Sequence, residues 1–419
     1  MKFSVNFRWL PLFVFVLTCS VHAQGLSGSW STLSSSGFTP RSSPFSVVLN
    51  GKLYVIDGDT VINYQQSRTG VPMNVMEVYD PSSNSWSPAS IEGKFPTFNG
   101  DGSADTLGGK IYVADAYQYA EGDVRMLQVF DPSSNTWSVV NTPKSFCVRD
   151  IPTIRTIGSK LYVFGGIGSY GLVDTIDVFD PATNTFSTIV PETSFQPRTG
   201  YTVSVVDGKV YMIGGDGIAD IDVFDTATGS WSQLQPDGDY TPRYTPTSTV
   251  LDGKIYVIGG EGEVGKEYFN LVEVYDPKTN SWSTPDVSGT AIGRAYATSA
   301  MVSGKIYVMG GSYRLGDGVT DTTLNTNELF TPSKSKVSER DEQPELRVWP
   351  NPATDRVVFD SLPQASDISI VNLLGAAVRQ FRNNAASQVQ CDLMGLMPGM
   401  YSAVVTTASF TKHIKVVVQ

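Results

Sequence analysis

Histidine is almost absent from this chain of 419 residues: the only two are His22 and His413, near the ends. The long middle of the chain therefore has no imidazole. Copper and zinc sites built on imidazole, His-based acid–base catalysis and Ser-His-Asp triads all need that side chain. The sequence excludes these sites from the middle of the chain, and it predicts no metal site and no cofactor.

Cysteine is also scarce, with three residues in all. Cys19 falls in the N-terminal segment, which leaves Cys147 and Cys391 for two separate regions of the remaining chain. We interpret these two as unpaired thiols, with a disulfide between them as the alternative. The fold does not depend on a disulfide framework.

Long apolar runs are missing except near the N-terminus, where Trp9–Leu17 follows Lys2 and Arg8. This run is too short for a permanent membrane span. Val21-His22-Ala23 supplies the small residues of a cleavage site, so residues 1–23 are predicted to be a signal peptide. Lipid attachment at Cys19 is the alternative. We expect a secreted or cell-surface protein with no integral membrane segment after cleavage.

Positive charge is in short supply between residues 24 and 333, where 19 Lys and Arg accompany 33 Asp and Glu. This region carries a net charge of −14, whereas residues 345–419, with six basic and five acidic residues, carry +1. An acidic surface repels nucleic acid and anionic membranes. The charge excludes nucleic acid as a partner and favours neutral glycans, proteins or cations.

What the chain does contain is a repeat. A string of Gly or Ser, Lys, an aliphatic residue, Tyr, and Val or Met occurs six times, with its lysines 45 to 58 residues apart. The lysines are Lys52, Lys110, Lys160, Lys209, Lys254 and Lys305. Four copies run into a glycine pair, while the first has Asp57-Gly58 and the second Ala114-Asp115. Such a strand is apolar on both faces, as a sheet between two other sheets requires, and glycines at its end permit a close backbone approach.

The first five copies continue with an aromatic residue, an aspartate and a later aromatic residue. In the first copy these are Tyr79, Asp80 and Trp86, with Asn84 in the turn between them. Gly229 replaces this Asn in the fourth copy, which indicates a left-handed backbone at that position. Four short strands in each copy are typical of the blades of a β-propeller.

These features, over roughly residues 28–333, resemble the kelch repeats of the galactose oxidase/kelch superfamily. The resemblance implies an all-β fold with a six-bladed kelch β-propeller at residues 24–333. The sixth copy has Phe330 but no later aromatic residue, and Trp30 stands alone before the first copy. We therefore predict that the strand around Trp30 pairs with the strand near Phe330 and closes the propeller.

A polar linker is predicted at residues 334–344, and alternating strands at residues 345–419 predict a small immunoglobulin-like β-sandwich. Strings in this module resemble the type A C-terminal sorting domain of the type IX secretion system of Bacteroidetes. The matching residues are Pro350, Asn351, Pro352, Gly375, Pro398, Gly399, Tyr401 and Lys412. This resemblance implies the type IX secretion machinery as a partner, and the alternative is an ordinary accessory domain.

The expected ligand site lies where the loops before the first strand and after the second strand of each blade open on the same side. Arginine, tyrosine and carboxylate side chains there suit a sugar or an acidic peptide side chain. The candidates are Arg41, Arg149, Arg198, Arg243, Arg294, Tyr117, Tyr119, Glu121 and Glu261. The alternative is that the arginines brace neighbouring blades.

Two classes of function remain open. The first is a non-catalytic recognition module for a glycan or a protein, which we expect. The second is a histidine-independent carbohydrate-active enzyme, similar to the six-bladed kelch epimerases of sialic acid in using Arg with carboxylates. Glu and Arg converging in one pocket would favour the enzyme, whereas scattered charges would favour binding.

Overall fold

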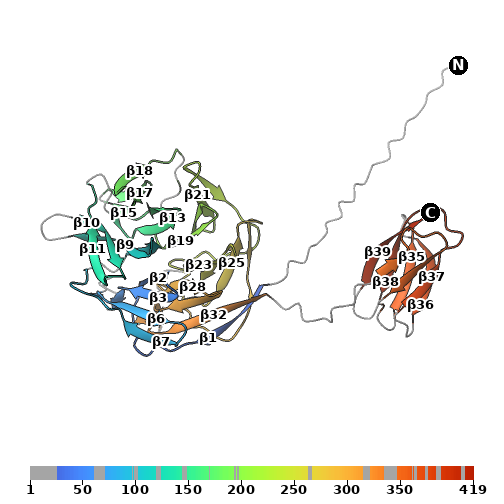
Figure 1. Cartoon of the computed structure of the whole chain (residues 1–419), viewed down its shortest axis with the longest axis horizontal. Coiled ribbons are helices and arrows are strands. Elements are labelled where there is room, and N and C mark those ends of the chain that lie inside the picture. Colours follow the sequence, from blue (N-terminus) through green and yellow to red (C-terminus); the bar gives the residue numbers. More distant parts are fainter. Residues whose placement is uncertain are drawn as a thin grey trace, which may run out of the picture. The chain divides into compact units, whose positions relative to one another are not determined.

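The computed structural model describes residues 26–60, 71–96, 98, 102–118, 124–143, 149–168, 170–192, 195, 198–262, 267–314, 321–334, 347–360, 362, 366–372, 376–383, 388–406 and 411–419 (Figure 1). The predicted signal peptide, residues 335–344 of the predicted linker, Tyr119, Glu121, Cys147 and Gly375 lie outside these ranges. The side chains of Tyr117 and Lys412 are likewise not described. Within the described ranges, no helix is long and apolar enough to cross a membrane. The chain divides into two compact units, Met1–Ser335 and Lys336–Gln419, each considered by itself below.

Among the described residues of the first unit, six sheets have four or five strands, and the first five of them each take four antiparallel strands in chain order. The first sheet consists of β2 (Phe45–Leu49), β3 (Lys52–Ile56), β6 (Met76–Asp80) and β7 (Ser85–Pro88). The second consists of β8 (Ser103–Leu107), β9 (Lys110–Gln118), β10 (Val124–Asp131) and β11 (Thr136–Val140). The third consists of β13 (Thr153–Ile157), β14 (Lys160–Phe164), β17 (Ile176–Asp180) and β18 (Thr185–Ile189).

The remaining sheets repeat the pattern. The fourth consists of β19 (Tyr201–Val206), β20 (Lys209–Gly214), β21 (Ile221–Asp225) and β22 (Ser230–Leu234). The fifth consists of β23 (Thr247–Leu251), β24 (Lys254–Ile258), β25 (Val272–Asp276) and β26 (Ser281–Ser283). The sixth consists of β28 (Thr298–Val302), β29 (Lys305–Met309), β32 (Asn327–Lys334), β1 (Leu26–Thr32) and β27 (Asp286–Ser288). Short pairings join β4 (Asp59–Thr60) to β5 (Val71–Pro72) and β30 (Ser312–Arg314) to β31 (Asp321–Thr323).

The first strands of the six sheets are neighbours in a ring. Strand β2 contacts β8, β8 contacts β13, β13 contacts β19, β19 contacts β23, β23 contacts β28, and β28 contacts β2. All six also line a common channel of about 490 Å³. The sheets therefore turn their first strands towards one centre.

The apolar second strands are buried on both faces, as their sequence predicts. In β3, Leu53 and Val55 pack with residues of the sixth sheet, whereas Ile56 packs with Ile111 and Val113 of the second sheet. All five side chains are fully buried. Each contributes roughly 1.5–3 kcal/mol by leaving water.

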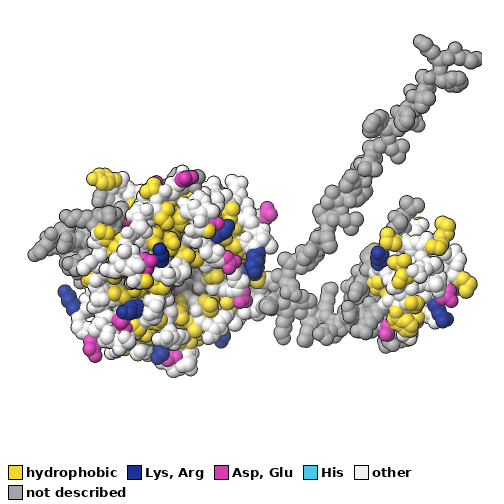
Figure 2. Space-filling model, turned by 45° about the horizontal axis from the view of Figure 1, so that its top comes forward, with side chains coloured by type: hydrophobic (Ala, Val, Ile, Leu, Met, Phe, Trp, Pro, Cys, Tyr) yellow, Lys and Arg dark blue, Asp and Glu magenta, His cyan; other side chains and the backbone are white. Residues whose placement is uncertain are grey.

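The repeated lysines and aspartates pair across neighbouring strands. Lys52 lies 3.0 Å from Asp80, and Lys110 lies 2.9 Å from Asp131. The same pairs occur in the next three sheets, at Lys160–Asp180, Lys209–Asp225 and Lys254–Asp276. Several basic side chains accordingly lie beside acidic ones on the face seen in Figure 2.

The turns that follow these aspartates have the predicted left-handed backbone. Asn84 has φ = 49°, and Gly229, at the equivalent position of the fourth sheet, has φ = 70°. The prediction from the exchange of Asn for Gly is therefore confirmed.

The N-terminal strand joins the sixth sheet. Strand β1 pairs antiparallel with β32 and places Trp30 opposite Phe330, with 5.0 Å between the ring centroids. This confirms the predicted pairing. The sequence did not predict β27, which comes from the chain leaving the fifth sheet and pairs parallel with β1.

The second unit has two antiparallel sheets over one core. One consists of β33 (Arg347–Trp349), β34 (Arg356–Asp360) and β37 (Gln388–Asp392), and the other of β36 (Ala377–Asn383), β35 (Ser366–Val371), β38 (Gly399–Thr406) and β39 (Thr411–Val418). Phe359 and Cys391 from the first sheet share the core with Ile368 and Val405 from the second. Cys391 is a free thiol, and burial raises its pKa to about 12.

Two of the residues that resemble the sorting domain, Asn351 and Tyr401, form hydrogen bonds within this unit. The Asn351 side chain accepts a hydrogen bond from the Val417 N–H at 2.8 Å and donates one to the Lys415 carbonyl at 2.7 Å, which fixes its loop to β39. The Tyr401 hydroxyl donates to the Met397 carbonyl at 2.9 Å. These hydrogen bonds join the loop around Asn351 to β39 and the segment around Met397 to β38.

Candidate functional site

Five arginines occupy equivalent positions in the loops that precede the first strands, here termed lead-in loops. Each is at most 2% exposed, and each forms an ion pair with an acid on the third strand of the same sheet. The pairs, here termed braces, are Arg41–Glu77, Arg149–Asp177, Arg198–Asp222, Arg243–Glu273 and Arg294–Glu328.

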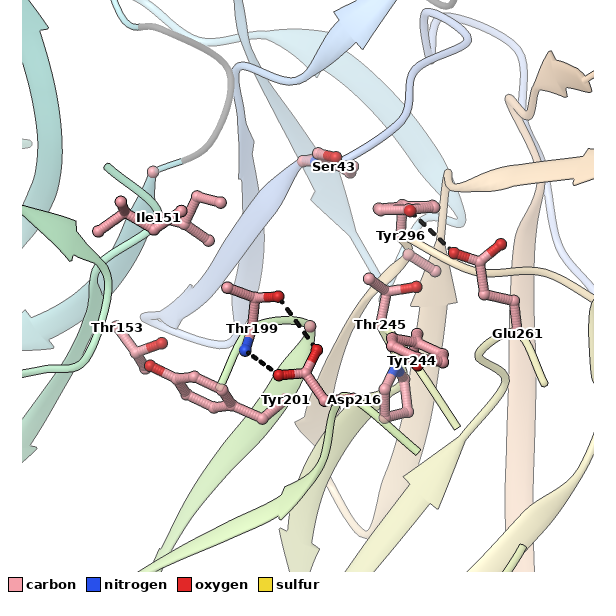
Figure 3. A pocket seen from close by; sticks show the side chains of 16 residues that line it. Ser43, Ile151, Thr153, Thr199, Tyr201, Asp216, Tyr244, Thr245, Glu261 and Tyr296 are labelled. Carbon is pink, nitrogen blue, oxygen red and sulfur yellow. Dashed lines mark hydrogen bonds between the residues drawn. The ribbon is translucent and has the colours of Figure 1, made fainter. Parts of the chain in front are cut away.

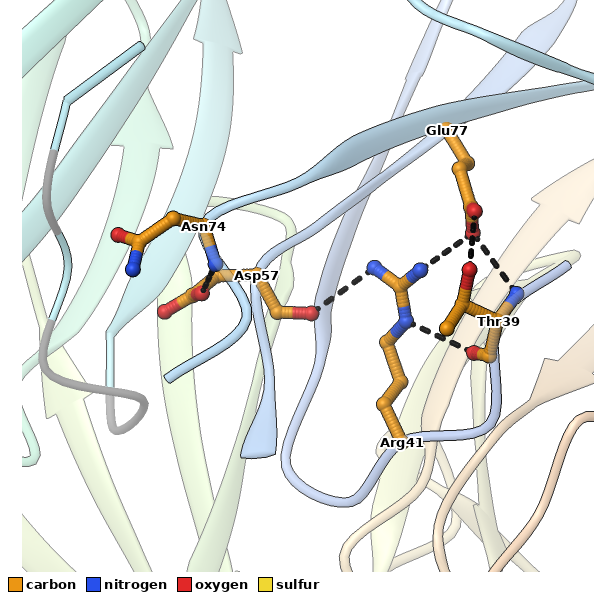
Figure 4. Close-up of polar contacts among 5 residues, drawn as sticks. All are labelled: Thr39, Arg41, Asp57, Asn74 and Glu77. Carbon is orange, nitrogen blue, oxygen red and sulfur yellow. Dashed lines mark hydrogen bonds and ion pairs between the residues drawn. The ribbon is translucent and has the colours of Figure 1, made fainter. Parts of the chain in front are cut away.

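The brace of the first sheet shows how the buried charges are satisfied (Figure 4). Besides its pair with Glu77, Arg41 donates to the carbonyls of Thr39 and Asp57, both at 3.0 Å. Glu77 accepts further hydrogen bonds from the Thr39 hydroxyl at 2.6 Å and the Thr39 N–H at 3.1 Å. A buried ion pair is tolerated when its remaining hydrogen-bonding sites are filled in this way.

Burial shifts the pKa of one or both partners in three of the braces. It raises the pKa of Asp222 and of Glu328, and it lowers the pKa of Arg41 and of Arg294. The opposite charge of the partner counters each shift. The opposite charge in each pair therefore offsets part of the cost of burying the other.

The backbone of these arginines contacts the neighbouring sheet through the glycine pairs. The second glycine N–H donates to the arginine carbonyl in Gly311–Arg41 at 2.8 Å and in Gly260–Arg294 at 2.7 Å. A Cβ on Gly310 would lie 2.9 Å from the Arg41 oxygen. The glycine pairs thus permit this close approach. The bracing alternative needs one correction: the side chains brace their own sheet, and only the backbone reaches the neighbour.

A left-handed residue follows two positions after each of the five arginines. The φ values are 52° at Ser43, 54° at Ile151, 66° at Gly200, 49° at Thr245 and 56° at Tyr296. Positive φ is rare for β-branched and bulky residues, and such strain collects at functional sites.

Backbone hydrogen bonds link four of these residues across sheet boundaries. The Thr245 N–H donates to Gly200, the Tyr296 N–H to Thr245 and the Ser43 N–H to Tyr296, at 2.6, 3.3 and 2.9 Å. The braces therefore hold lead-in loops whose left-handed residues form an arc around the channel.

These residues line a pocket of about 650 Å³, here termed the channel mouth (Figure 3). It shares Gly102, Thr153, Tyr201 and Ala297 with the channel lined by the first strands. The full lining consists of Ser43, Pro44, Gly102, Ile151, Thr153, Ile167, Thr199, Gly200, Tyr201, Asp216, Tyr244, Thr245, Pro246, Glu261, Tyr296 and Ala297.

Hydroxyl groups and two carboxylates supply the polar chemistry of the mouth. The Tyr296 hydroxyl donates to Glu261 at 2.9 Å, and the Thr199 N–H donates to Asp216 at 3.2 Å (Figure 3). Glu261 is 1% exposed, whereas Asp216 is exposed. Burial raises the pKa of Tyr201. The mouth therefore offers aromatic rings, hydroxyls and negative charge.

Comparison with known proteins assigns the first unit. The family described as "KLHDC2/KLHL20/DRC7 Kelch-repeats domain" matches residues 46–260 and 216–347, well over half of the chain. The protein belongs to the kelch-repeat family. Residues 347–419 match the "Secretion system C-terminal sorting domain", so the second unit is the sorting domain of type IX secretion.

Curated kelch proteins match over shorter stretches. Kelch-like protein 21 of Danio rerio is 32% identical over 113 residues, which cover 27% of this chain and 16% of that protein. Kelch domain-containing protein 3 of Bos taurus is 30% identical over 121 residues, which cover 28% of this chain and 31% of that protein. The matched part spans at most about a third of these relatives.

The kelch structure brings only one of the nine predicted ligand residues, Glu261, to the mouth within the described ranges. The five arginines are buried in the braces of their own sheets, whereas the bracing alternative expects them to brace neighbouring blades. None of Arg41, Arg149, Arg198, Arg243 and Arg294 is among the described residues that line the mouth. The side chain of Tyr117 is not described, and Tyr119 and Glu121 lie outside the described residues.

Sequence reasoning missed the left-handed residues and the acids of the braces. The acids had a signal: in five repeats a Glu or Asp stands three residues before the position of the repeated Asp, as Glu77 does before Asp80. A carboxylate on a buried third strand is strongly destabilising unless a cation pairs with it. The left-handed residues share only their distance from the arginine, and their side chains have nothing else in common.

Proposed function

We propose that this protein is an exported kelch propeller that recognises a ligand at the channel mouth without catalysing a reaction on it. The observation that carries the proposal is the mouth itself: a pocket of about 650 Å³ whose lead-in loops are held by buried ion pairs. Fixing loops before binding reduces the entropy lost on association. The ligand is a glycan or a protein.

The proposed architecture is a six-bladed propeller at residues 24–333, closed by β1, then a linker at residues 334–344 and an immunoglobulin-like sandwich at residues 345–419. The ring of first strands and the pairing of Trp30 with Phe330 support the propeller. Two sheets over one core support the sandwich.

The sorting domain supports export to the cell surface or the medium. We propose that residues 1–23 are the signal peptide and that the host belongs to Bacteroidetes. Residues 345–419, fused with a signal peptide to an unrelated reporter, should carry the reporter out of a type IX-competent bacterium. Retention in the periplasm, while a known sorting domain exports the same reporter, would contradict this role.

The enzymatic alternative needs Arg and Glu together in one pocket. Among the described residues, those that line the mouth include Glu261 and Asp216 but no Arg or Lys. The arginines that the alternative would use are already paired inside the blades. This arrangement favours recognition over catalysis.

The experiment is a screen of glycan and peptide arrays with the mature chain and with the Ser43→Gly/Thr245→Gly variant. Glycine accepts the positive φ of both positions, so the variant removes mouth side chains without strain. Asn50→Gly, at an exposed left-handed turn outside the mouth, is the matched control. We expect array signals that the control keeps and the mouth variant loses. Signals that survive in the mouth variant would contradict the proposal.

A further inference from the structure

We propose that the channel lined by the six first strands holds a small oxyanion, a carboxylate or a sulfate-like group, beside Arg155 and Ser103. This inference does not rest on the ligand proposed for the mouth. Two features carry it: hydrogen-bond donors that meet no acceptor among the described residues, and a positive charge enclosed in a channel of about 490 Å³.

Arg155 is the only basic residue among the described residues that line the channel. It lies in β13, opposite Tyr162 of the repeated string. The residues opposite the equivalent tyrosine in the other five sheets are Val47, Asp105, Ser204, Thr249 and Ala300. An arginine is therefore not needed at this position to build a first strand.

The guanidinium of Arg155 is held in place by three of its five N–H donors. Its Nε–H donates to the Val203 carbonyl at 3.0 Å, and Nη1 donates to the Ile154 carbonyl at 2.7 Å and to Ser103 Oγ at 3.5 Å. No described residue accepts a hydrogen bond from Nη2. A fixed cation therefore keeps two N–H donors for a ligand.

Ser103 adds a donor next to this guanidinium. Its Oγ accepts hydrogen bonds from the Ile154 N–H at 3.3 Å and from Arg155, and it donates its own hydrogen to no described residue. A hydroxyl whose oxygen is already occupied by two donors can still donate to an anion. Arg155 and Ser103 together therefore offer neighbouring donors to one ligand.

A group of three hydroxyls lines the same channel on the fourth and fifth sheets. The Ser248 hydroxyl forms hydrogen bonds with those of Thr202, at 2.6 Å, and Ser204, at 2.9 Å. Three hydroxyls joined by two hydrogen bonds leave one hydrogen for a further acceptor. The lining thus supplies donors beyond the guanidinium.

Asp105 is the only acid in the described lining, and its carboxylate is already bonded. Its two oxygens accept hydrogen bonds from the Thr106 and Thr156 N–H groups, both at 2.7 Å. Burial lowers the pKa of Arg155, and the charge of Asp105 counters this shift. An anion in contact with the guanidinium would counter the shift further, because an opposite charge favours the ionised form.

The charge of the whole domain limits the size of the anion. Residues 24–333 carry a net charge of −14, which repels a polyanion. At physiological salt, charges more than about 8 Å away are largely screened, so a small anion inside the channel interacts mainly with Arg155. Separate donors on Arg155 and Ser103 suit the separate oxygens of an oxyanion.

The test is titration calorimetry of the mature chain with sodium sulfate and, separately, with sodium acetate. We expect saturable binding that Arg155→Met weakens by about tenfold or more, since a charge-assisted hydrogen bond is lost. Ser103→Ala should weaken it by about threefold. Asp105→Asn should strengthen it by about threefold, because a like charge is removed. Saturation by sulfate alone assigns a tetrahedral anion, and saturation by acetate alone assigns a carboxylate.

Matched controls separate these effects from general changes in charge or stability. Lys94→Met removes an exposed positive charge outside the channel, and Ser87→Ala removes an exposed hydroxyl outside it. Both controls should keep the wild-type affinity. Melting curves verify that each variant is folded. If Arg155→Met does not fold, Arg155→Lys takes its place and should bind more weakly than the wild type, because the fixed planar donors are lost.

Two results would overturn the proposal. If neither anion binds the wild type, or if the Arg155 and Ser103 variants bind as the wild type does, Arg155 serves only to bond the edges of the first strands. If chloride binds as tightly as sulfate and acetate, the site does not select oxyanions.

Discussion

In the six-bladed propeller proposed above, the second blade differs from the other five in ways that separate what builds a blade from what builds the mouth. It keeps four antiparallel strands, the Lys110–Asp131 pair and the contact of Phe130 with Trp137. Its chain has no arginine in the lead-in loop, and its second strand has Ala114-Asp115 at the position of the glycine pair and runs on to Gln118. Strand pairing and apolar layers therefore suffice to form a blade. The brace is needed only to fix the lead-in loop.

The third strand of the second blade makes the same distinction. Gln128 stands where the other five blades have Glu77, Asp177, Asp222, Glu273 or Glu328, and it is 7% exposed. A buried acid without a cation is strongly destabilising, so the acid is absent where the arginine is absent. Five repeats retain both charges and one retains neither.

The largest expected effect comes from the sixth blade, which borrows an outer strand from the N-terminus. Deleting residues 24–33 removes β1 and uncovers Phe330, the partner of Trp30. Loss of the buried Trp30 ring alone costs about 3–5 kcal/mol, so the melting temperature should fall by on the order of 10 °C or more. Calorimetry checks this. An unchanged melting curve would show that β1 does not hold the propeller closed.

Breaking a brace should give the next largest effect. Arg198→Ala leaves Asp222 buried without its cation, which destabilises by about 3–5 kcal/mol. Arg243→Ala should do the same to Glu273. Urea unfolding of each variant measures the loss.

A control that imitates the uncharged second blade sharpens this test. In Arg198→Met/Asp222→Leu both charges are replaced by apolar groups, so most of the lost stability should return. If the double variant is no more stable than Arg198→Ala, the arginine acts through packing rather than charge. If Arg198→Ala unfolds like the wild type, Arg198 does not brace the blade.

The contrast between blades also explains what the sequence could predict. Repeated strings such as Gly304-Lys305-Ile306-Tyr307 report strands and turns, because local spacing determines both. The pairing of Trp30 with Phe330 followed from a missing aromatic residue. The burial of the arginines could not be predicted from the sequence. An arginine before a strand gives the same sequence pattern whether its guanidinium turns into the blade or out to a ligand.

The shape of the mouth was harder still to predict. Ile151 and Thr245 are residues that local preference places at negative φ, and only their fixed lead-in loops give them positive values. Asp216 and Glu261 each follow the glycine pair of their own blade, so their spacing predicts a common face, but it does not predict that they line one pocket. Tertiary contacts determine these features.

A medium effect is expected at the glycine pairs that the second blade lacks. A Cβ on Gly260, where φ is +99°, would lie 2.9 Å from the Tyr244 oxygen, whereas Gly253, with φ at +73°, has nothing within 4 Å. Gly253→Ala should cost about 1–2 kcal/mol from backbone strain alone. Gly260→Ala should cost about 1–3 kcal/mol more from the overlap. Equal losses in urea unfolding would show that Gly260 serves the turn and not the close approach to the lead-in loop of its own blade.

The smallest expected effect concerns a feature that the second blade shares with the first, third, fourth and fifth blades, the exposed Lys–Asp pair. Hydrogen bonds from Ser82 and from Lys52 lower the pKa of Asp80 to about 2. Because the folded pKa lies below the unfolded value of about 3.9, ionised Asp80 stabilises the fold above that value, and the contribution is lost as pH falls towards 2. Asp80→Asn should therefore melt about 1–2 °C below the wild type at pH 7, and the gap in melting temperature should close near pH 2.

Asp239→Asn, at an exposed acid with no part in these pairs, should show no such gap at either pH. A gap for Asp80→Asn that persists at pH 2 would mean that the aspartate acts through its shape in the turn. The pair that all of the first five blades share would then contribute less to stability than the braces that one of them lacks.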